Sequence, residues 1–222
     1  MGVSATGHSQ LGRIVSVLAA LALLVLVPAT PVAAASSVRL VRDIVSGGKG
    51  ARPRGLTSVG DTLYFNADDG THGSELWRSD GTEAGTVIVR DIWPGEAGSH
   101  PSWLADVSGT LYFAADDGTH GRELWRSDGT ETGTVMVKEI APFDLTDVGG
   151  TLYFTADDGI HGRELWRSDG TEAGTEMVKD ICGFDCSSPR QLTDVGGTLY
   201  FAADDGTHGD ELWKSDGTEA GT

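Results

Sequence analysis

Pairs of adjacent aspartates recur four times along the chain, and each pair is followed at once by glycine. Closely spaced carboxylates, together with backbone carbonyls, are the hard oxygen ligands that calcium prefers. The pattern also has a structural interpretation, because an Asp before Gly caps a tight turn and Gly adopts the positive φ that such a turn needs. Both interpretations, calcium site and turn, stay open for Asp68, Asp69, Asp116, Asp117, Asp157, Asp158, Asp204 and Asp205.

A histidine follows each aspartate pair, and a glutamate follows each histidine three residues later. Four histidines suggest a metal, but zinc needs its nitrogens at about 2 Å. Equivalent positions in neighbouring repeats lie on the order of 10 Å or more apart, as stacked sheets do. We therefore expect hydrogen bonds within each loop for His72, His120, His161 and His208. We expect turn amides or nearby arginines as partners for Glu75, Glu123, Glu164 and Glu211, and no catalytic pair of carboxylates.

The motifs of common enzyme classes do not occur in the sequence: there is no nucleophile elbow, phosphate loop or HExxH string. Repetition itself weakens an enzymatic interpretation, since a catalytic site brings different residues to one unique point. Two irregular connections interrupt the repetition. One spans residues 93–103 and carries His100 and Trp103, and the other is the string CGFDC. Because function concentrates on loops above a rigid scaffold, these connections are the places to look for it.

The candidate residues belong to a unit that is written four times. The string ELWRSDGTEAGT at 75–86 returns almost unchanged at 123–134, 164–175 and 211–222, each time after a block such as TLYFAADDGTHG. The units open at Leu56, Leu104, Leu145 and Leu192, with spacings of 48, 41 and 47 residues. Such periods are typical of a four-stranded β-propeller blade, and no helical apolar stripe supports a helical solenoid.

One unit predicts four strands, which in the third copy cover 145–148, 151–156, 164–168 and 176–181. Both faces of the second strand are apolar, which indicates a sheet packed between two neighbouring sheets. One tryptophan per unit is expected to fill the gap between blades, and the alternative is a ring of exposed aromatics that stack on sugars. These residues are Trp77, Trp125, Trp166 and Trp213.

The two ends of the repeat region complement each other in sequence. Residues 38–44 read VRLVRDI and match the fourth strand of a unit, VIVRDI at 87–92, whereas the last unit stops before its own fourth strand. One expectation is that 38–44 pairs beside 211–215 and closes a ring of about four blades, which removes open sheet edges. The alternative is a portion of a longer array, and an open ring would favour self-association.

The beginning of the chain predicts export. Arg13 precedes an uncharged apolar stretch at 14–27, and small residues follow at 33–35. Fourteen apolar residues fall short of the roughly 20 that span a bilayer, so we interpret 1–35 as a cleaved signal peptide and expect no stable membrane insertion. In an oxidising compartment, Cys182 and Cys186 are expected to form a short-range disulfide. The net charge of −17 disfavours nucleic acid and anionic membranes as partners.

The string ELW-x-x-DGT-x-x-GT, present four times, resembles the bacterial ELWxxDGT repeat family, and the resemblance covers 38–222. It implies an exported, propeller-like protein built from several copies, with no agreed activity. Residues 36–222 are thus expected to form one all-β, β-propeller-like domain of four-stranded antiparallel blades. Its units are 56–103, 104–144, 145–191 and 192–222, with an additional strand at 38–44.

The sequence favours a secreted or cell-surface scaffold, not an enzyme, that binds an extracellular protein or glycan. Two alternatives remain. One is a hydrolase or lyase that acts on extracellular polysaccharide, and the other is a structural repeat protein stabilised by calcium, the one cofactor that the sequence suggests.

Overall fold

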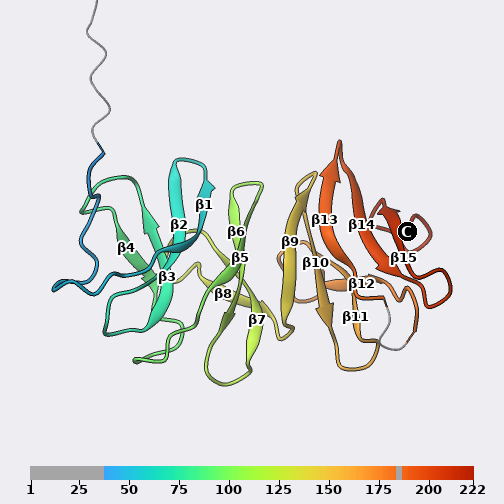
Figure 1. The fold of residues 1–222 in the computed structure, drawn as a ribbon, viewed down its shortest axis with the longest axis horizontal. Helices are drawn as coiled ribbons and strands as arrows, with labels where there is room; N and C mark the ends of the chain where they lie inside the picture. Colours follow the sequence, from blue (N-terminus) through green and yellow to red (C-terminus); the bar gives the residue numbers. More distant parts are fainter. Residues whose placement is uncertain (1–37, 184–186) are drawn as a thin grey trace, which may run out of the picture. The chain divides into compact units, whose positions relative to one another are not determined.

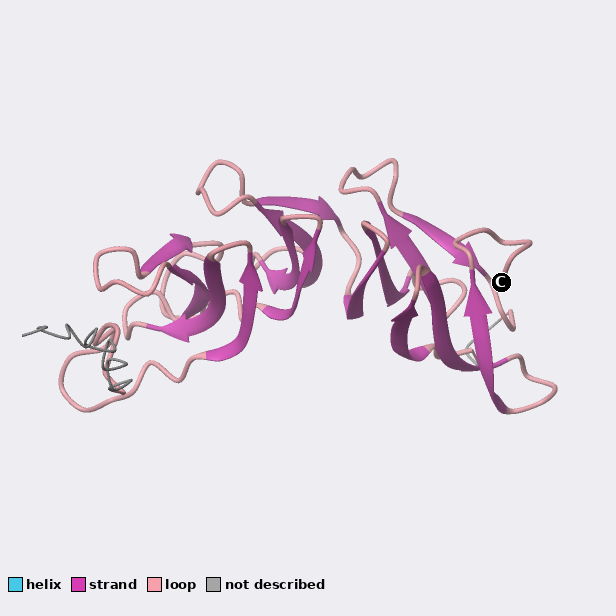
Figure 2. Ribbon diagram, turned by 90° about the horizontal axis from the view of Figure 1, so that it is seen from above, coloured by secondary structure: helices cyan, strands magenta, loops and turns pink. Residues whose placement is uncertain are grey.

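The computed structural model describes residues 38–183 and 187–222, and every regular element in these ranges is a β-strand (Figure 2). Residues 39–222 form one compact unit. No helix in the described ranges has the length and apolar character needed to cross a membrane. The predicted signal peptide at 1–35 lies outside the described residues.

The strands form four antiparallel sheets that follow one another in sequence order (Figure 1). Within each sheet every strand pairs with its neighbour in the chain. The first sheet contains β1 (Arg54–Val59), β2 (Thr62–Asp68), β3 (Ser74–Ser79) and β4 (Val87–Arg90), and the second contains β5 (Ser102–Val107), β6 (Thr110–Asp116), β7 (Arg122–Ser127) and β8 (Val135–Lys138). The third contains β9 (Pro142–Val148), β10 (Thr151–Asp157), β11 (Arg163–Ser168) and β12 (Glu176–Lys179), and the last contains β13 (Arg190–Val195), β14 (Thr198–Asp204) and β15 (Asp210–Ser215).

The strand positions agree closely with the sequence pattern. In the third sheet the second and third strands begin and end within one residue of their predicted bounds. The first strand starts earlier than predicted, at Pro142, because a bulge around Asp144 lets pairing continue past the expected start. The fourth strand ends at Lys179, two residues short of the prediction.

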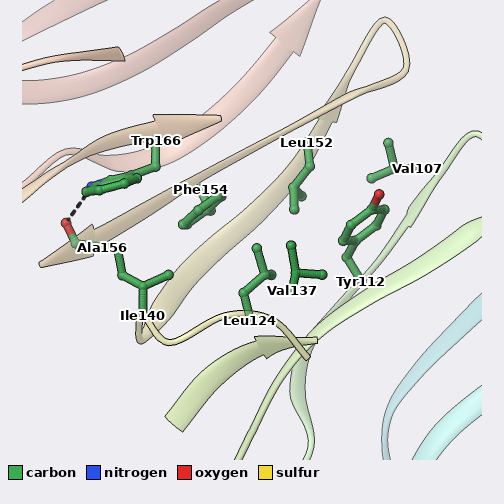
Figure 3. Packing of buried hydrophobic residues seen from close by; sticks show 9 residues of the cluster. All are labelled: Val107, Tyr112, Leu124, Val137, Ile140, Leu152, Phe154, Ala156 and Trp166. Carbon is green, nitrogen blue, oxygen red and sulfur yellow. Dashed lines mark hydrogen bonds between the residues drawn. The ribbon is translucent and has the colours of Figure 1, made fainter. Parts of the chain in front are cut away.

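Neighbouring sheets pack face to face through one apolar cluster at each interface. Between the second and third sheets, Tyr112, Leu124, Val137 and Ile140 meet Leu152, Phe154, Ala156 and Trp166 (Figure 3). The same positions form the interfaces on either side. Each sheet therefore presents a Phe–Trp face in one direction and a Tyr–Leu–Val–Ile face in the other.

The repeated tryptophans lie within these clusters. Trp125 and Trp166 are buried, and each stacks on a phenylalanine of its own sheet, with the ring centroids of Phe154 and Trp166 6.4 Å apart. Trp213 is partly buried, and Trp77 packs in a smaller cluster beside Ile44. Truncation of a buried tryptophan of this kind to alanine costs about 3–5 kcal/mol.

The turn that follows the third strand explains why the string SDGTxxGT recurs letter by letter. In the third sheet, Asp169 Oδ1 accepts hydrogen bonds from the backbone N and Oγ1 of Thr171, at 2.9 and 2.7 Å. Thr171 Oγ1 in turn accepts one from the Gly174 N at 3.0 Å. The hydroxyls of Ser168 and Thr175 lie 2.7 Å apart and link the two ends of the turn. Each letter of the string thus has a hydrogen-bonding role.

The glycine in this turn also fixes the distance between sheets. Gly170 has a φ of 88°, and a Cβ at this position would overlap the hydroxyl of Tyr112 in the preceding sheet. Gly129 has the same relation to Tyr64, and Gly217 to Tyr153. Glycine is therefore required at this position for two reasons: its φ is positive, and the tyrosine hydroxyl leaves no room for a Cβ.

Ring closure by the N-terminal residues is not observed. Residues 38–44 form no strand, and β15 has no partner beyond it, so the last sheet contains three strands. Arg42 Nη1 donates to the Thr86 carbonyl at 2.5 Å, just as Arg90 Nη1 donates to that of Thr134. Among the described residues, no contact between the first and last sheets compares with those between consecutive sheets. Residues 38–44 instead contact the first sheet, through Ile44 and Arg42.

Replacing Gly170 with alanine tests the close approach between sheets, and Gly159→Ala is the matched control. Gly159 also has a positive φ, of 80°, but a Cβ there meets nothing within 4 Å. We expect Gly159→Ala to cost about 1–2 kcal/mol from backbone strain alone. Gly170→Ala should cost about 1–3 kcal/mol more, from overpacking against Tyr112. Urea unfolding of the two variants measures the difference, and equal losses would contradict the packing described above.

Candidate functional site

Hydrogen bonds within each Asp-Asp-Gly loop engage both of its carboxylates. In the third sheet, Asp157 Oδ1 accepts from the Gly159 N at 2.7 Å, and Asp158 Oδ1 accepts from the backbone N of Ile160 and His161 at 2.9 Å. Asp158 Oδ2 lies 2.7 Å from His161 Nδ1. The other three loops repeat this pattern. The hydrogen bonds support the turn interpretation, and calcium binding by the eight aspartates stays a prediction.

The histidine of each loop interacts with the second aspartate of its own pair, as expected from the sequence. In the last sheet, the hydrogen bond from the His208 side chain is the main cause that lowers the pKa of Asp205 to about 2. The same bond raises the pKa of His208 above its ordinary value. Both pKa shifts are consequences of this contact at the surface.

Two of the four repeated glutamates are buried and well satisfied. Glu75 accepts hydrogen bonds from the backbone N of Ile92, Trp93 and Ser99 at 3.2, 3.2 and 2.8 Å, and from Ser99 Oγ at 2.5 Å. Glu164 accepts from the Ile181 N at 3.1 Å and from Ser187 Oγ. All of these donors belong to the long connection that leads to the next sheet. Burial raises the pKa of Glu164 to about 6, although the hydrogen bonds oppose that rise.

Glu123 is equally buried but lacks these donors. Its Oε2 accepts a hydrogen bond from Trp125 Nε1 at 3.1 Å, and its Oε1 has no partner. Burial raises the pKa of Glu123 to about 7. The cause lies in chain length, because the connection after β8 spans only residues 139–141, whereas the equivalent connections span 91–101 and 180–189. The short connection brings no serine to the carboxylate.

Glu123 also belongs to a cluster with metal-ligating character. Its carboxylate, the imidazole of His120 and the carboxylate of Asp117 each offer a ligand atom, and the three atoms lie within 4.8 Å of one another. No other such group of three occurs among the described residues. Distances between repeats make a metal site shared by histidines of different repeats unfavourable, but all three ligands of this cluster come from a single repeat. Distances between repeats therefore do not bear on it.

A second set of candidate residues lies on the first strands of the four sheets, β1, β5, β9 and β13, which contact one another in that order. Each first strand contains an irregularity in its register. At each one a residue adopts a positive φ, between 53° and 63°. These residues, which we call the bulge row, are Gly55, Trp103, Asp144 and Gln191. A bulge commonly re-aims a side chain next to a functional site.

Aromatic and polar groups gather around the bulge row. The Trp103 side chain is 46% exposed, and its ring meets Phe143 edge-on at 6.4 Å between centroids. The Arg163 guanidinium lies 4.2 Å from the centroid of the Phe143 ring. Asp144 Oδ2 accepts a hydrogen bond from the Gln191 N at 3.2 Å, which joins the third and last sheets. The bulge row thus combines an exposed aromatic surface with hydrogen-bonding groups.

A hollow of about 480 Å³ adjoins Trp103, and its polar lining includes Arg52, Arg54, Asn66 and His100. The irregular connection singled out from the sequence, with His100 and Trp103, therefore borders a cavity. A larger hollow of about 740 Å³ lies along β15. There Leu212 is 77% exposed, whereas its counterparts in the other sheets are fully buried. That hollow borders the edge of β15 at which the other sheets carry a fourth strand.

The remaining sequence predictions fall partly outside the described residues. The expected disulfide joins Cys182 to Cys186, and Cys186 lies in the interval 184–186 that the structure does not describe. The disulfide stays a prediction. Asp144 and Gln191 were missed as site residues, although one signal could have found them. They stand directly before the repeated Leu, at a position where the copies carry four different residues.

The chain is similar in fold to solved β-propeller proteins. The β-propeller domain of the Trilobed protease from Pyrococcus furiosus, described as having an open velcro topology, is 12% identical with a TM-score of 0.52, and the match covers 73% of this chain and 52% of that one. Pyrococcus horikoshii acylaminoacyl peptidase is 11% identical with a TM-score of 0.53, over 77% of this chain and 26% of that one. A puromycin hydrolase mutant is 19% identical with a TM-score of 0.52, over 74% and 26%.

These similarities define the class of protein: the chain has an all-β, β-propeller-like fold built from antiparallel blades. This chain matches about a quarter to a half of the length of those proteins. No family model matches the chain, and no curated protein matches it.

The buried Glu164 gives a pH-dependent contribution to stability. Its pKa in the folded chain is about 6, above the ordinary value of 4.5. As pH rises, the unfolded chain loses this proton first, so the contribution is complete below about pH 4.5 and is lost as pH rises through about 6. Between about pH 4 and pH 7 we expect the original chain to lose about 2 kcal/mol more than Glu164→Gln does. Urea unfolding at both pH values measures this, and parallel losses in the two proteins would refute it.

Proposed function

We propose that the chain is a secreted repeat scaffold, without catalytic activity, that binds extracellular glycans through the bulge row. One observation carries the proposal. The four first strands share the register shift, the positive φ and the Leu that follows it, yet the four equivalent positions carry glycine, tryptophan, aspartate and glutamine. A shared backbone with divergent side chains at one position is the pattern expected where a rigid fold presents a specific surface.

The chemistry of the bulge row suits a sugar better than a flat protein surface. Trp103 offers an exposed ring on which the apolar face of a sugar can stack, and Phe143 supports that ring from the side. Asp144 and Gln191 supply an acceptor and an amide that suit sugar hydroxyls. A few polar groups placed around an aromatic surface fix the orientation of a small ligand.

The net charge of the chain limits which glycans it is expected to bind. The net charge of −17 repels polyanions, so neutral or basic glycans are the favoured ligands. Secretion is supported by the predicted signal peptide at 1–35 and by the resemblance to the exported ELWxxDGT repeat proteins. Both are arguments from sequence.

Removal of the aromatic surface should weaken glycan binding without unfolding the chain. We expect Trp103→Ala to weaken binding to the preferred glycan at least about tenfold, or about 1.4 kcal/mol. The matched control is Val195→Ala, which removes another exposed apolar side chain from a first strand, at the opposite end from the bulge. A glycan microarray identifies the ligand, and calorimetry with the secreted protein measures the affinities of the two variants.

Four results would count against the proposal. One is equal affinity of Trp103→Ala and the original chain, and another is a protein partner captured in place of any glycan. The third is release of reducing sugar from the bound glycan, which would support the alternative of a polysaccharide-degrading enzyme. Loss of binding in Val195→Ala as well would show that the surface is not specific to the bulge row.

A further inference from the structure

The cluster in the second sheet brings three different ligating groups together within one repeat. Asp117 and His120 belong to the loop between β6 and β7, and Glu123 is the second residue of β7. Their ligand atoms lie within 4.8 Å of one another, close enough for small displacements to place all three around one ion. A cluster of this kind needs independent support, because acidic groups often gather without a metal.

That support comes from the unpartnered oxygen of Glu123. The side chain is fully buried, its Oε1 has no hydrogen-bond partner, and the carboxylate contributes a ligand atom to the cluster. A buried acceptor without a hydrogen-bond partner lowers the stability of the folded chain, and a bound ion at the oxygen would remove that cost. Glu75 and Glu164 differ from Glu123, because the hydroxyls of Ser99 and Ser187 donate hydrogen bonds to their carboxylates.

The other repeats serve as internal controls for this argument. Each carries the same Asp–His–Glu spacing, yet among the described residues only the second repeat gathers the three groups. The difference lies in the connection to the next sheet, which here is only three residues long and places no donor on the glutamate. All four repeats therefore share the Asp–His–Glu motif, but only the second brings the three side chains together around an unpartnered carboxylate oxygen.

A fourth residue, Glu139, lies close to the histidine. Glu139 Oε1 lies 3.5 Å from His120 Nε2, and His120 is the one histidine among the described residues with contacts to two carboxylates. The equivalent residues in the first and third repeats are the shorter Asp91 and Asp180. A carboxylate on one imidazole nitrogen fixes the tautomer that leaves the other nitrogen free to bind a metal.

We propose that Asp117, His120 and Glu123 form a binding site for a divalent transition-metal cation, zinc above all, with Glu139 as the residue that orients His120. One imidazole and two carboxylates suit zinc, whose fourth position is then open to water. Calcium is a poor fit, because it takes six to eight oxygen ligands and does not favour imidazole. The site is distinct from the bulge row and goes beyond the proposed glycan binding.

Calorimetric titration of the chelator-treated secreted protein with zinc chloride tests this site. We expect one zinc ion per chain, and at least a tenfold loss of affinity in Glu123→Gln. Glu75→Gln and Glu164→Gln change equally buried glutamates that already have hydrogen-bond partners, so both should bind zinc as the original chain does. The expected rise in melting temperature with zinc should disappear in Glu123→Gln alone among these three.

His120→Gln guards against a folding defect in Glu123→Gln. The His120 side chain is 39% exposed, so its loss should leave the core intact while it lowers zinc affinity at least tenfold. Retained zinc affinity in both Glu123→Gln and His120→Gln would overturn the proposal, and so would the absence of saturable binding. Displacement of zinc by an equal concentration of calcium would also overturn it. Trp103→Ala should bind zinc normally, which separates failure of this site from failure of the glycan site.

Discussion

Every sheet between two neighbours buries both of its faces, and this two-sided burial is the constraint on which the rest of the structure depends. One face presents the Phe and Trp of the second and third strands, and the other presents Tyr, Leu and the aliphatic residues of the fourth strand. The hydrophobic effect favours this stacking, and the match between the two faces makes it repeatable. In the second, third and last sheets, the glycine of the SDGT turn then sets the spacing, because it sits against the tyrosine hydroxyl of the sheet before it.

This constraint leaves little freedom for variation. A substitution in either face disturbs an interface, and a substitution in the SDGT turn removes a hydrogen bond that the turn needs. Two features escape it: the side chain at each first-strand bulge and the length of the connection between sheets. The candidate glycan surface uses the first, and the candidate metal site depends on the second. Both candidate sites thus lie where the packing between sheets tolerates sequence variation among the repeats.

Much of the fold was predictable from sequence because its determinants are local. Apolar residues on both faces marked β10, and the Asp-Gly pair marked the turn that follows it. The bulges were not predictable, since nothing in their composition announces a positive φ at Trp103, Asp144 or Gln191. The missing hydrogen-bond partner of Glu123 was equally unpredictable, because the sequence around Glu123 matches that around Glu164. The two repeats differ in length only after the following strand, in the connection to the next sheet. Residues 38–44 resemble a strand, but a strand also requires an edge to pair with, and that edge is a property of the assembled fold.

The short connection after β8 suggests how repeat proteins acquire new chemistry. No ligand had to be gained, since aspartate, histidine and glutamate already occupy every copy. A connection that is too short to carry a hydrogen-bond donor to Glu123 is enough to leave one carboxylate oxygen without a partner. The length of a single connection can thus give one copy of a repeated motif an environment that the other copies lack.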